Sequence, residues 1–285
     1  MARFLILGGG GMLAYAIKSD PLFADLMSVD LPECDITRIE NIEEIVSKHQ
    51  PKYIINCAAY TDVVKAETEK ELAILVNAEA VKNIAVISKK YKIKLVHYST
   101  DFVFKGDKNI AYTEDMPMNA VNHYGHSKLL GEQYIKDIYP ETLVIRVSWL
   151  YGPKGKNLFS KLPDLIKEKS ALQIIHDQMG KTTYTFDVAT ATQKLLETEA
   201  TGVYHFANEG VISRFDFATM VRDILKRANK DLNCDIKPVL AADFPDPTPR
   251  PTWSALCCDK YTEKTGEKPR WWQDALQDFI EKYDR

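Results

Sequence analysis

Four consecutive glycines, Gly8 to Gly11, follow the first apolar run of the chain at residues 3–7 and lead into a segment of helical period at residues 11–19. A turn of this kind between a strand and a helix is typical of dinucleotide binding, because its backbone N–H groups stay open to a diphosphate. In Gly8-x-x-Gly11-x-x-Ala14, Ala14 is small enough for close packing of helix on strand. A merely flexible turn is the alternative. The position directly after the first strand favours the dinucleotide turn.

Short apolar runs alternate with longer segments of helical period in the first half of the chain. Strands are predicted at residues 3–7, 27–30, 53–56, 94–98 and 143–147, and helices at 39–49, 70–90 and 124–137. Runs that are apolar throughout are typical of strands covered on both faces. The pattern therefore predicts an α/β fold, a Rossmann-type doubly wound parallel sheet.

After about residue 150 the alternation is less regular. Helices are predicted at residues 157–169, 186–197, 215–228 and 271–283, strands at 172–175 and 203–207, and an extended proline-rich loop at 243–253. We therefore predict a dinucleotide-binding domain over residues 1–150. A smaller C-terminal α/β substrate domain is predicted over residues 151–285, with segments that can interleave with the first.

Composition excludes several classes of protein. The chain has 285 residues, 45% of them hydrophobic, and a net charge of −3, which is unlike a disordered chain and gives no general attraction to nucleic acid. No apolar run reaches the roughly 18 residues of a membrane span. The five cysteines contain no C-x-x-C pair, which argues against a disulfide framework and favours a cytoplasmic protein. His123 and His126 alone are a weak metal signal, and we expect no metal site.

Two acidic residues follow the second predicted strand. Asp30 lies at its end, where a carboxylate typically binds the ribose hydroxyls of a dinucleotide. A plain loop acid is the alternative. Asp35 has two interpretations, as an acceptor for an adenine amino group or as a cap of the next helix. Cofactor binding is the first hypothesis for both residues.

Tyr124 and Lys128 are four residues apart, so on a helix they lie on one face. An ammonium beside a phenol is expected to lower the tyrosine pKa and to ready the pair for proton transfer. Thr100 ends the fourth predicted strand, at the sheet edge where ligands of such folds bind. These three residues together predict hydride transfer to a carbonyl, with Tyr124 as the proton donor.

Several motifs of the chain resemble those of one known protein family. Gly8-x-x-Gly11, the run from Tyr98 to Phe104 and Tyr124-x-x-x-Lys128 resemble the extended short-chain dehydrogenase/reductases. Further segments narrow the resemblance to the dTDP-4-dehydrorhamnose reductase family, over nearly the whole chain. They are residues 56–61, 65–67, 76–78, 146–152, 177–180, 202–208 and 250–251.

The resemblance implies reduction of the 4-keto group of dTDP-6-deoxy-L-lyxo-4-hexulose to dTDP-L-rhamnose with NADH or NADPH. Thr100, Tyr124 and Lys128 would be catalytic, and Thr100, Asp101 and Trp149 would contact the sugar. The implied cofactor-binding residues are Gly8, Gly11, Met12, Leu13, Asp30, Asp35, Ile36, Ala58, Ala59, Tyr60, Thr61, Asn77, Tyr124 and Lys128. The segments 177–180 and 243–253 are expected to frame the sugar nucleotide. Because Asp30 would repel a 2′-phosphate, we expect NADH to be used at least as well as NADPH.

Four residues depart from the family pattern: Val64, Ala120, Thr182 and Arg214, the last at a position where an aromatic residue is common. These departures concern mainly the sugar-binding half. Two other functions stay open, a nucleotide-sugar 4-epimerase or dehydratase and a regulatory subunit that binds without catalysis. The expected partner is a dTDP-sugar rather than nucleic acid or a membrane, and a homodimer is compatible with the sequence.

Overall fold

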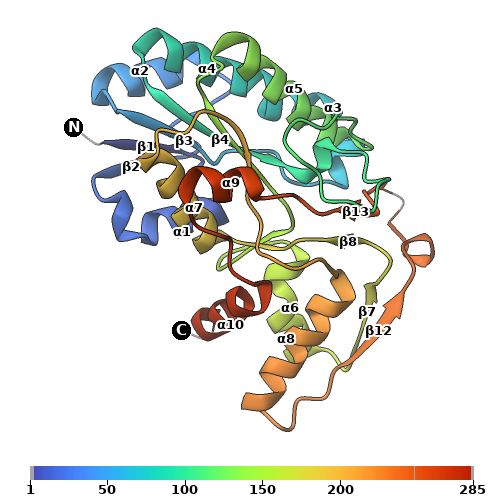
Figure 1. The fold of residues 1–285 in the computed structure, drawn as a ribbon. Coiled ribbons are helices and arrows are strands. Elements are labelled where there is room, and N and C mark those ends of the chain that lie inside the picture. Colours follow the sequence, from blue (N-terminus) through green and yellow to red (C-terminus); the bar gives the residue numbers. More distant parts are fainter. Residues whose placement is uncertain (1–2, 247, 284–285) are drawn as a thin grey trace.

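The computed structural model describes residues 3–246 and 248–283, and its centre is a six-stranded sheet (Figure 1). The strand order is β10-β5-β4-β3-β1-β2, and all neighbours are parallel. The bounds are β1 Phe4–Leu7, β2 Leu26–Val29, β3 Tyr53–Asn56, β4 Lys94–Thr100, β5 Leu143–Val147 and β10 Gly202–His205. The predicted Rossmann-type parallel sheet is confirmed. Since β1 lies between β2 and β3, the strand order reverses there, which places a ligand crevice at the carboxyl ends of β1 and β3.

Helices cover both faces of this sheet, as Figure 1 shows. On one face lie α1 (Met12–Ser19) and α7 (Thr185–Glu197), and on the other α2 (Ile39–His49), α4 (Ala80–Tyr91) and α5 (His123–Ile138). Side chains alternate between the faces along each strand. Phe4 and Ile6 of β1 thus pack with α1 and α7, whereas Leu5 and Leu7 pack with α2 and α4. Burial on both faces explains why the strands are apolar throughout.

The single helix predicted over residues 70–90 is wrong in one respect. It consists of α3 (Lys70–Ile74), a π-helical turn at Leu75–Glu79 and α4. Asn77, in the π-turn, is completely buried against α5, where a Cβ on Gly131 would collide with the Asn77 carbonyl oxygen. Such turns often occur at functional sites. Periodicity does not reveal this one, because long-range contacts of Asn77 fix it.

The second half of the chain builds a separate hydrophobic core and also completes the first sheet through β10. Its other strands are short: β6 (Leu150–Tyr151), β7 (Ala171–Ile175), β8 (Met179–Gly180), β9 (Thr183–Tyr184), β11 (Ile212–Ser213), β12 (Asp235–Val239) and β13 (Trp253–Ser254). Its helices are α6 (Leu158–Glu168), α8 (Arg214–Ala228), α9 (Asp259–Thr265) and α10 (Trp272–Tyr283). The sequence analysis did not predict β12, α9 or the two-residue strands. Most of the predicted proline-rich loop is irregular, but Trp253 belongs to β13, and Pro247 lies outside the described residues.

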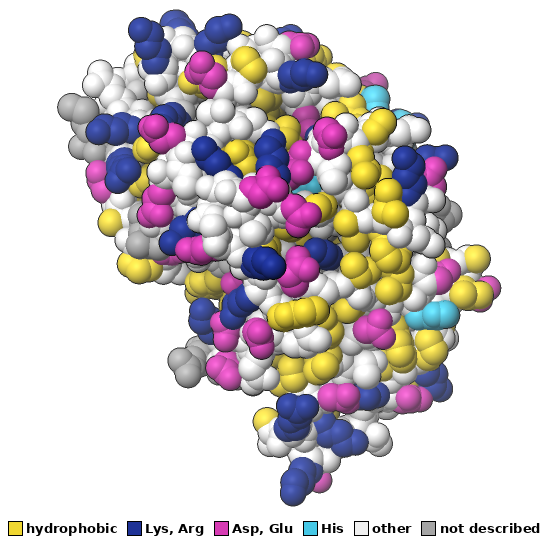
Figure 2. Space-filling model, in the orientation of Figure 1, with side chains coloured by type: hydrophobic (Ala, Val, Ile, Leu, Met, Phe, Trp, Pro, Cys, Tyr) yellow, Lys and Arg dark blue, Asp and Glu magenta, His cyan; other side chains and the backbone are white. Residues whose placement is uncertain are grey.

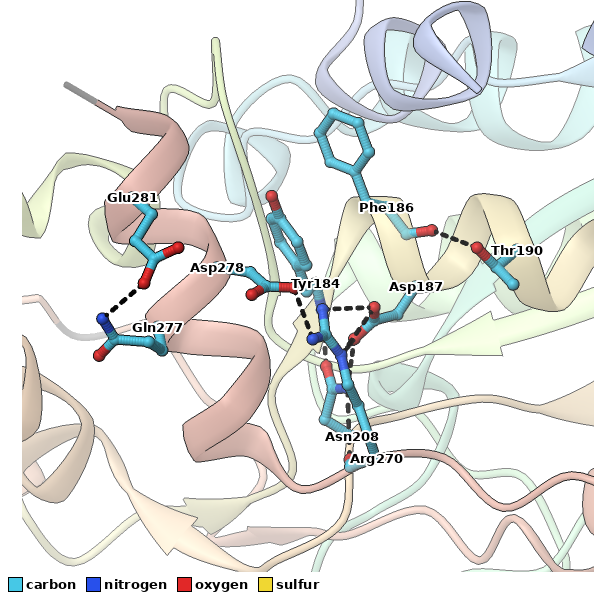
Figure 3. Close-up of polar contacts among 9 residues, drawn as sticks. All are labelled: Tyr184, Phe186, Asp187, Thr190, Asn208, Arg270, Gln277, Asp278 and Glu281. Carbon is cyan, nitrogen blue, oxygen red and sulfur yellow. Dashed lines mark hydrogen bonds and ion pairs between the residues drawn. The ribbon is translucent and has the colours of Figure 1, made fainter. Parts of the chain in front are cut away.

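Arg270 connects the C-terminal helix α10 to α7 through ion pairs (Figure 3). Its guanidinium forms ion pairs with Asp187 of α7, at 2.8 Å, and with Asp278 of α10, at 2.6 Å. Asn208 donates a hydrogen bond to the same Asp187 and accepts one from the backbone N–H of Tyr184. One cation thus joins the helix on the large sheet to the C-terminal helix.

The face in Figure 2 carries acidic and basic side chains interspersed over its upper part, while hydrophobic side chains gather near the β8–β13 segment. Within the described part of the chain, no helix is long and apolar enough to cross a membrane. All five cysteines are free.

Candidate active site

The glycine turn joins β1 to α1 at the carboxyl edge of the sheet. Gly8 has φ +79°, and a Cβ there would lie 2.5 Å from the backbone nitrogen of Ala58, so a larger residue cannot be accommodated. Gly11 is the N-cap of α1 and has no side chain to accept from the N–H groups of the first turn. Those N–H groups, beginning at Met12, are free for an anionic ligand.

Asp30 lies directly against this turn. One of its carboxylate oxygens accepts from the Gly10 N–H at 2.7 Å, and the other accepts from the Leu31 N–H at 2.8 Å. The side chain is exposed, so lone pairs remain for a ligand. The structure therefore brings the predicted ribose-binding acid next to the glycine turn.

Asp35 does not cap the next helix. α2 begins at Ile39 with Arg38 as its N-cap residue, whereas the Asp35 carboxylate accepts from the backbone N–H and the hydroxyl of Thr37. The hydroxyl of Thr37 is the main reason that the Asp35 pKa is lowered. Arg38 pairs with Asp35 at 3.8 Å and is largely exposed. The alternative that Asp35 caps the next helix is thus wrong, because Arg38 is the N-cap residue. A contact of Asp35 with adenine stays a prediction.

Two of the residues expected at the cofactor have buried side chains. Leu13 packs in the core with α7, and Ile36 packs in the core with α2, so contacts of these two residues with a cofactor stay a prediction. Met12 is partly exposed, and its sulfur accepts from the Ser160 hydroxyl of α6 at 3.4 Å. The start of α1 therefore touches the C-terminal half of the chain.

The loop after β3 carries Ala58, Ala59, Tyr60 and Thr61, and Asn77 holds it in place. The Asn77 side chain accepts from the Tyr60 N–H and donates to the Tyr60 carbonyl oxygen, both at 2.9 Å. It also donates to the Ser127 hydroxyl of α5. Asn77 is fully buried by these contacts, so it positions Tyr60. Its direct contact with a cofactor stays a prediction, as do those of the partly exposed Ala58, Ala59 and Tyr60 and the exposed Thr61.

Thr100 and Tyr124 meet where β4 ends and α5 begins. Gly125 permits this approach, because a Cβ at that position would collide with the Phe102 carbonyl oxygen. The Phe102 and Tyr124 rings pack edge to face with centroids 5.7 Å apart. Burial raises the Tyr124 pKa to about 12, and a hydrogen bond from Thr100 opposes this. The expected lowering of the Tyr124 pKa by Lys128 is absent, since the effect of burial dominates.

Lys128 is buried one turn along α5. Its ammonium donates to the Tyr98 carbonyl oxygen at 2.7 Å and lies 3.3 Å from Nε2 of His97. Burial lowers the Lys128 pKa to about 8. An ammonium has three donors, so one remains beyond these two contacts. Lys128 is thus held at the end of β4 by Tyr98 and His97, with one N–H donor still available.

Asp101 and Trp149 are the other two residues expected at the sugar. Asp101 is buried, accepts from the Thr100 hydroxyl at 3.0 Å and leaves its second oxygen without a hydrogen bond. Burial raises its pKa to about 6. Trp149 stacks on Phe159 at 5.2 Å, and the Arg214 guanidinium lies 4.9 Å above the Trp149 ring.

The segments 177–180 and 243–253 lie side by side, because β8 pairs with β13 and the Met179 N–H donates to the Thr252 carbonyl oxygen. The Asn122 side chain donates to the Pro249 carbonyl oxygen and accepts from the Gly125 N–H as the N-cap of α5. The proline segment therefore reaches the helix that carries Tyr124. That these segments enclose a sugar nucleotide stays a prediction.

Several residues at this site were missed by sequence reasoning. Asn122 has a detectable signal, a capping residue three positions before Gly125. Ser254, which lies beside Asp101, has no such signal, because only the tertiary fold brings the two together. Gln178 lies in the expected segment 177–180, but its hydrogen bond from Arg214 Nε, at 3.1 Å, is likewise visible only in the tertiary fold. Across residues 3–246 and 248–283, no cluster of three or more His, Cys, Asp or Glu side chains could hold a metal ion.

Comparison with known proteins gives a consistent result. The family model described as RmlD substrate binding domain matches residues 2–285. The chain is 31% identical to the spore coat polysaccharide biosynthesis protein SpsK of Bacillus subtilis, covering 99% of this chain and 98% of that protein. It is 32% identical to dTDP-4-dehydrorhamnose reductase of Aggregatibacter actinomycetemcomitans, covering 98% of each. The crystal structure of dTDP-4-dehydrorhamnose reductase from Bacillus anthracis with NADP superposes with a TM-score of 0.93 at 32% identity, covering 99% of this chain and 100% of that chain.

Proposed function

The chain belongs to the dTDP-4-dehydrorhamnose reductase family, whose model is described as RmlD substrate binding domain, and on this basis we propose that it reduces the 4-keto group of a dTDP-linked 6-deoxy sugar with a nicotinamide cofactor. The product of the favoured reaction is dTDP-L-rhamnose. One observation carries the proposal: Thr100, Tyr124 and Lys128 converge at the carboxyl end of β4, in the same sheet edge as the glycine turn.

The residues at that edge fit a nicotinamide dinucleotide. Gly8 packs directly against the Ala58 backbone and leaves no room for a side chain, and the first turn of α1 has free N–H groups for a diphosphate. Asp30 offers carboxylate lone pairs to ribose hydroxyls. When bound, the cofactor supplies the hydride that reduces the sugar carbon.

Tyr124 is proposed as the proton donor. With its pKa raised to about 12, the phenol is protonated throughout the neutral range and can donate to the oxygen of the reduced carbonyl. The hydroxyl of Thr100 lies beside it, and by turning its one proton from Asp101 to the substrate it can donate a second hydrogen bond to the same oxygen. Developing negative charge on that oxygen would then be stabilised by two neutral donors.

Lys128 is proposed to hold the cofactor ribose and to stabilise the tyrosinate left after proton transfer. Its remaining donor is available for a ribose hydroxyl, because the other contacts, to Tyr98 and His97, anchor the ammonium from below. A buried cation close to a new anion lowers the free energy of the charged product state.

The assay that tests the proposal follows NADH or NADPH oxidation with dTDP-6-deoxy-L-lyxo-4-hexulose. We expect stoichiometric formation of dTDP-L-rhamnose. If cofactor oxidation requires a different nucleotide sugar, the proposed substrate is wrong. If no 4-keto sugar nucleotide supports cofactor oxidation, the proposed reductase activity is wrong.

The same experiment separates the two alternatives. An epimerase or dehydratase keeps its NAD through the cycle, so the purified protein would carry cofactor and consume none. A binding subunit would show no turnover. The convergence of Thr100, Tyr124 and Lys128 favours the reductase over a protein that only binds.

A further inference from the structure

Arg214, the first residue of α8, is placed unusually for an arginine. Its guanidinium lies 4.9 Å from the Trp149 ring centroid and 5.5 Å from that of Phe159, and Nε donates to Gln178. Burial lowers its pKa to about 10, and the nearby Arg250 adds to this. The side chain remains charged at neutral pH. The side chain is only partly buried, and a cation held against two aromatic rings favours a polar partner for its remaining donors.

Protein atoms do not supply that partner completely. Within the described residues, Nε is the only guanidinium nitrogen of Arg214 that makes a hydrogen bond. The Asp246 carboxylate does not supply this partner either, because it is already paired with Arg250 at 2.7 Å. The two terminal amino groups of Arg214 therefore keep unused donors.

Asp101 is the complementary group. It is 2% exposed, and one of its oxygens makes no well-formed hydrogen bond, although the Ser254 hydroxyl, itself unpaired, lies beside the carboxylate. It interacts electrostatically with Arg214, but no direct ion pair joins the two in the described part of the chain. Gly180 lies between the two groups, since a Cβ there would contact both the Ser254 hydroxyl, which lies beside Asp101, and the Trp149 ring, over which the guanidinium lies.

We propose that Arg214 is a specificity-determining residue, whose guanidinium and the free oxygen of Asp101 together bind one hydroxyl group of the sugar. A hydroxyl oxygen accepts from the guanidinium while its O–H donates to the carboxylate, so one group satisfies both. A phosphate oxygen cannot do this, because it has no proton to donate and Asp101 would repel it.

The geometry points to the hydroxyl on C3. This assignment rests on the proposed function, in which Thr100 and Tyr124 serve the oxygen on C4. The Thr100 hydroxyl contacts Asp101 at 3.0 Å, so Asp101 lies directly beside a group that serves the C4 oxygen. Of the two carbons bonded to C4, only C3 carries a hydroxyl group, because C5 carries the methyl group and the ring oxygen.

The test measures binding of dTDP, dTDP-L-rhamnose and its 3-deoxy and 2-deoxy analogues to the NADPH complex by calorimetry. Arg214→Gln should weaken dTDP-L-rhamnose roughly 10- to 100-fold, the usual range for a hydrogen bond to a charged group, and leave dTDP within about threefold. Arg222→Gln is the matched control, since Arg222 lies on the same helix and pairs with Asp223.

The deoxy analogues make the test independent of folding defects in the variant. The unmodified protein should bind the 3-deoxy analogue roughly 10- to 100-fold more weakly than dTDP-L-rhamnose, with a much smaller loss for the 2-deoxy analogue. In Arg214→Gln, the extra loss caused by 3-deoxygenation should fall to about threefold or less.

Equal weakening of dTDP and dTDP-L-rhamnose in Arg214→Gln would overturn the inference, because the residue would then serve the diphosphate or the pocket as a whole. An unchanged penalty for 3-deoxygenation would overturn it as well. Failure of the unmodified protein to reduce the 4-keto sugar would instead refute the proposed function.

Discussion

Lys128 donates a 2.7 Å hydrogen bond to the backbone carbonyl oxygen of Tyr98, one strand position before Ser99 and two before Thr100. This contact ties the middle of α5 to the end of β4. The same strand therefore positions Thr100 through its backbone and Lys128 through a carbonyl group. Both are held relative to Tyr124 by regular secondary structure.

The first prediction concerns the alkaline side of the pH profile. The pKa of Lys128 is lowered to about 8, so its cation is lost above that pH, while Tyr124, with a pKa of about 12, is still protonated. We expect kcat/KM to fall above about pH 8. In Lys128→Met this limb should vanish and kcat should be much reduced, whereas the exposed Lys136→Met on the same helix should behave as the parent. A limb that persists in Lys128→Met would contradict this.

The acidic limb of the pH profile is expected to depend on the ionisation of Asp101. Its pKa is raised to about 6, so the carboxylate becomes protonated below that pH and loses its capacity to accept from a sugar hydroxyl with full charge. We expect kcat/KM to fall below about pH 6 and Asp101→Asn to remove that limb. The KM for NADPH should stay flat over the same range, and a parallel change in that constant would argue for a general loss of structure.

Gly125→Ala tests the close approach of α5 to the segment after β4. The new methyl group would collide with the Phe102 carbonyl oxygen, which belongs to backbone and cannot easily move. Overpacking of this kind costs about 1–3 kcal/mol of unfolding free energy and should displace Tyr124. Urea denaturation and kcat check both effects. His126→Ala, at the exposed neighbouring position, should change neither, and a Gly125→Ala protein with parental stability and kcat would refute the account.

Much of the fold follows from the sequence because strand and helix periodicities are local properties. The strands of the large sheet and the helices on its faces were predicted within a few residues. The π-turn at Asn77, the two-residue strands and the β7–β12 pair were not, since they depend on contacts between distant segments. Of the site, the convergence of Thr100, Tyr124 and Lys128 follows from motif and strand position. The orientation of Lys128 toward Tyr98 and the place of Arg214 above Trp149 become visible only in three dimensions.

Cofactor preference depends on Asp30, which is held by the Gly10 and Leu31 N–H groups beside the glycine turn. We expect NADH to be used at least as well as NADPH, and Asp30→Ser to shift the ratio of kcat/KM values toward NADPH by roughly five- to thirtyfold. Glu33→Gln, an exposed acid in the same segment, is the control. A clear NADPH preference in the parent would contradict the expectation and make Arg38, exposed beside Asp35, the next residue to replace.

The most direct test of the central claim is the kcat of Tyr124→Phe with dTDP-6-deoxy-L-lyxo-4-hexulose and saturating cofactor. The ring and its edge-to-face contact with Phe102 remain, and only the proton donor is removed. We predict that kcat falls roughly 10²- to 10⁴-fold with cofactor binding nearly unchanged. Tyr134→Phe, on the same helix, should keep the parental value. A Tyr124→Phe enzyme that turns over at a rate close to the parent would contradict the assignment of Tyr124 as proton donor.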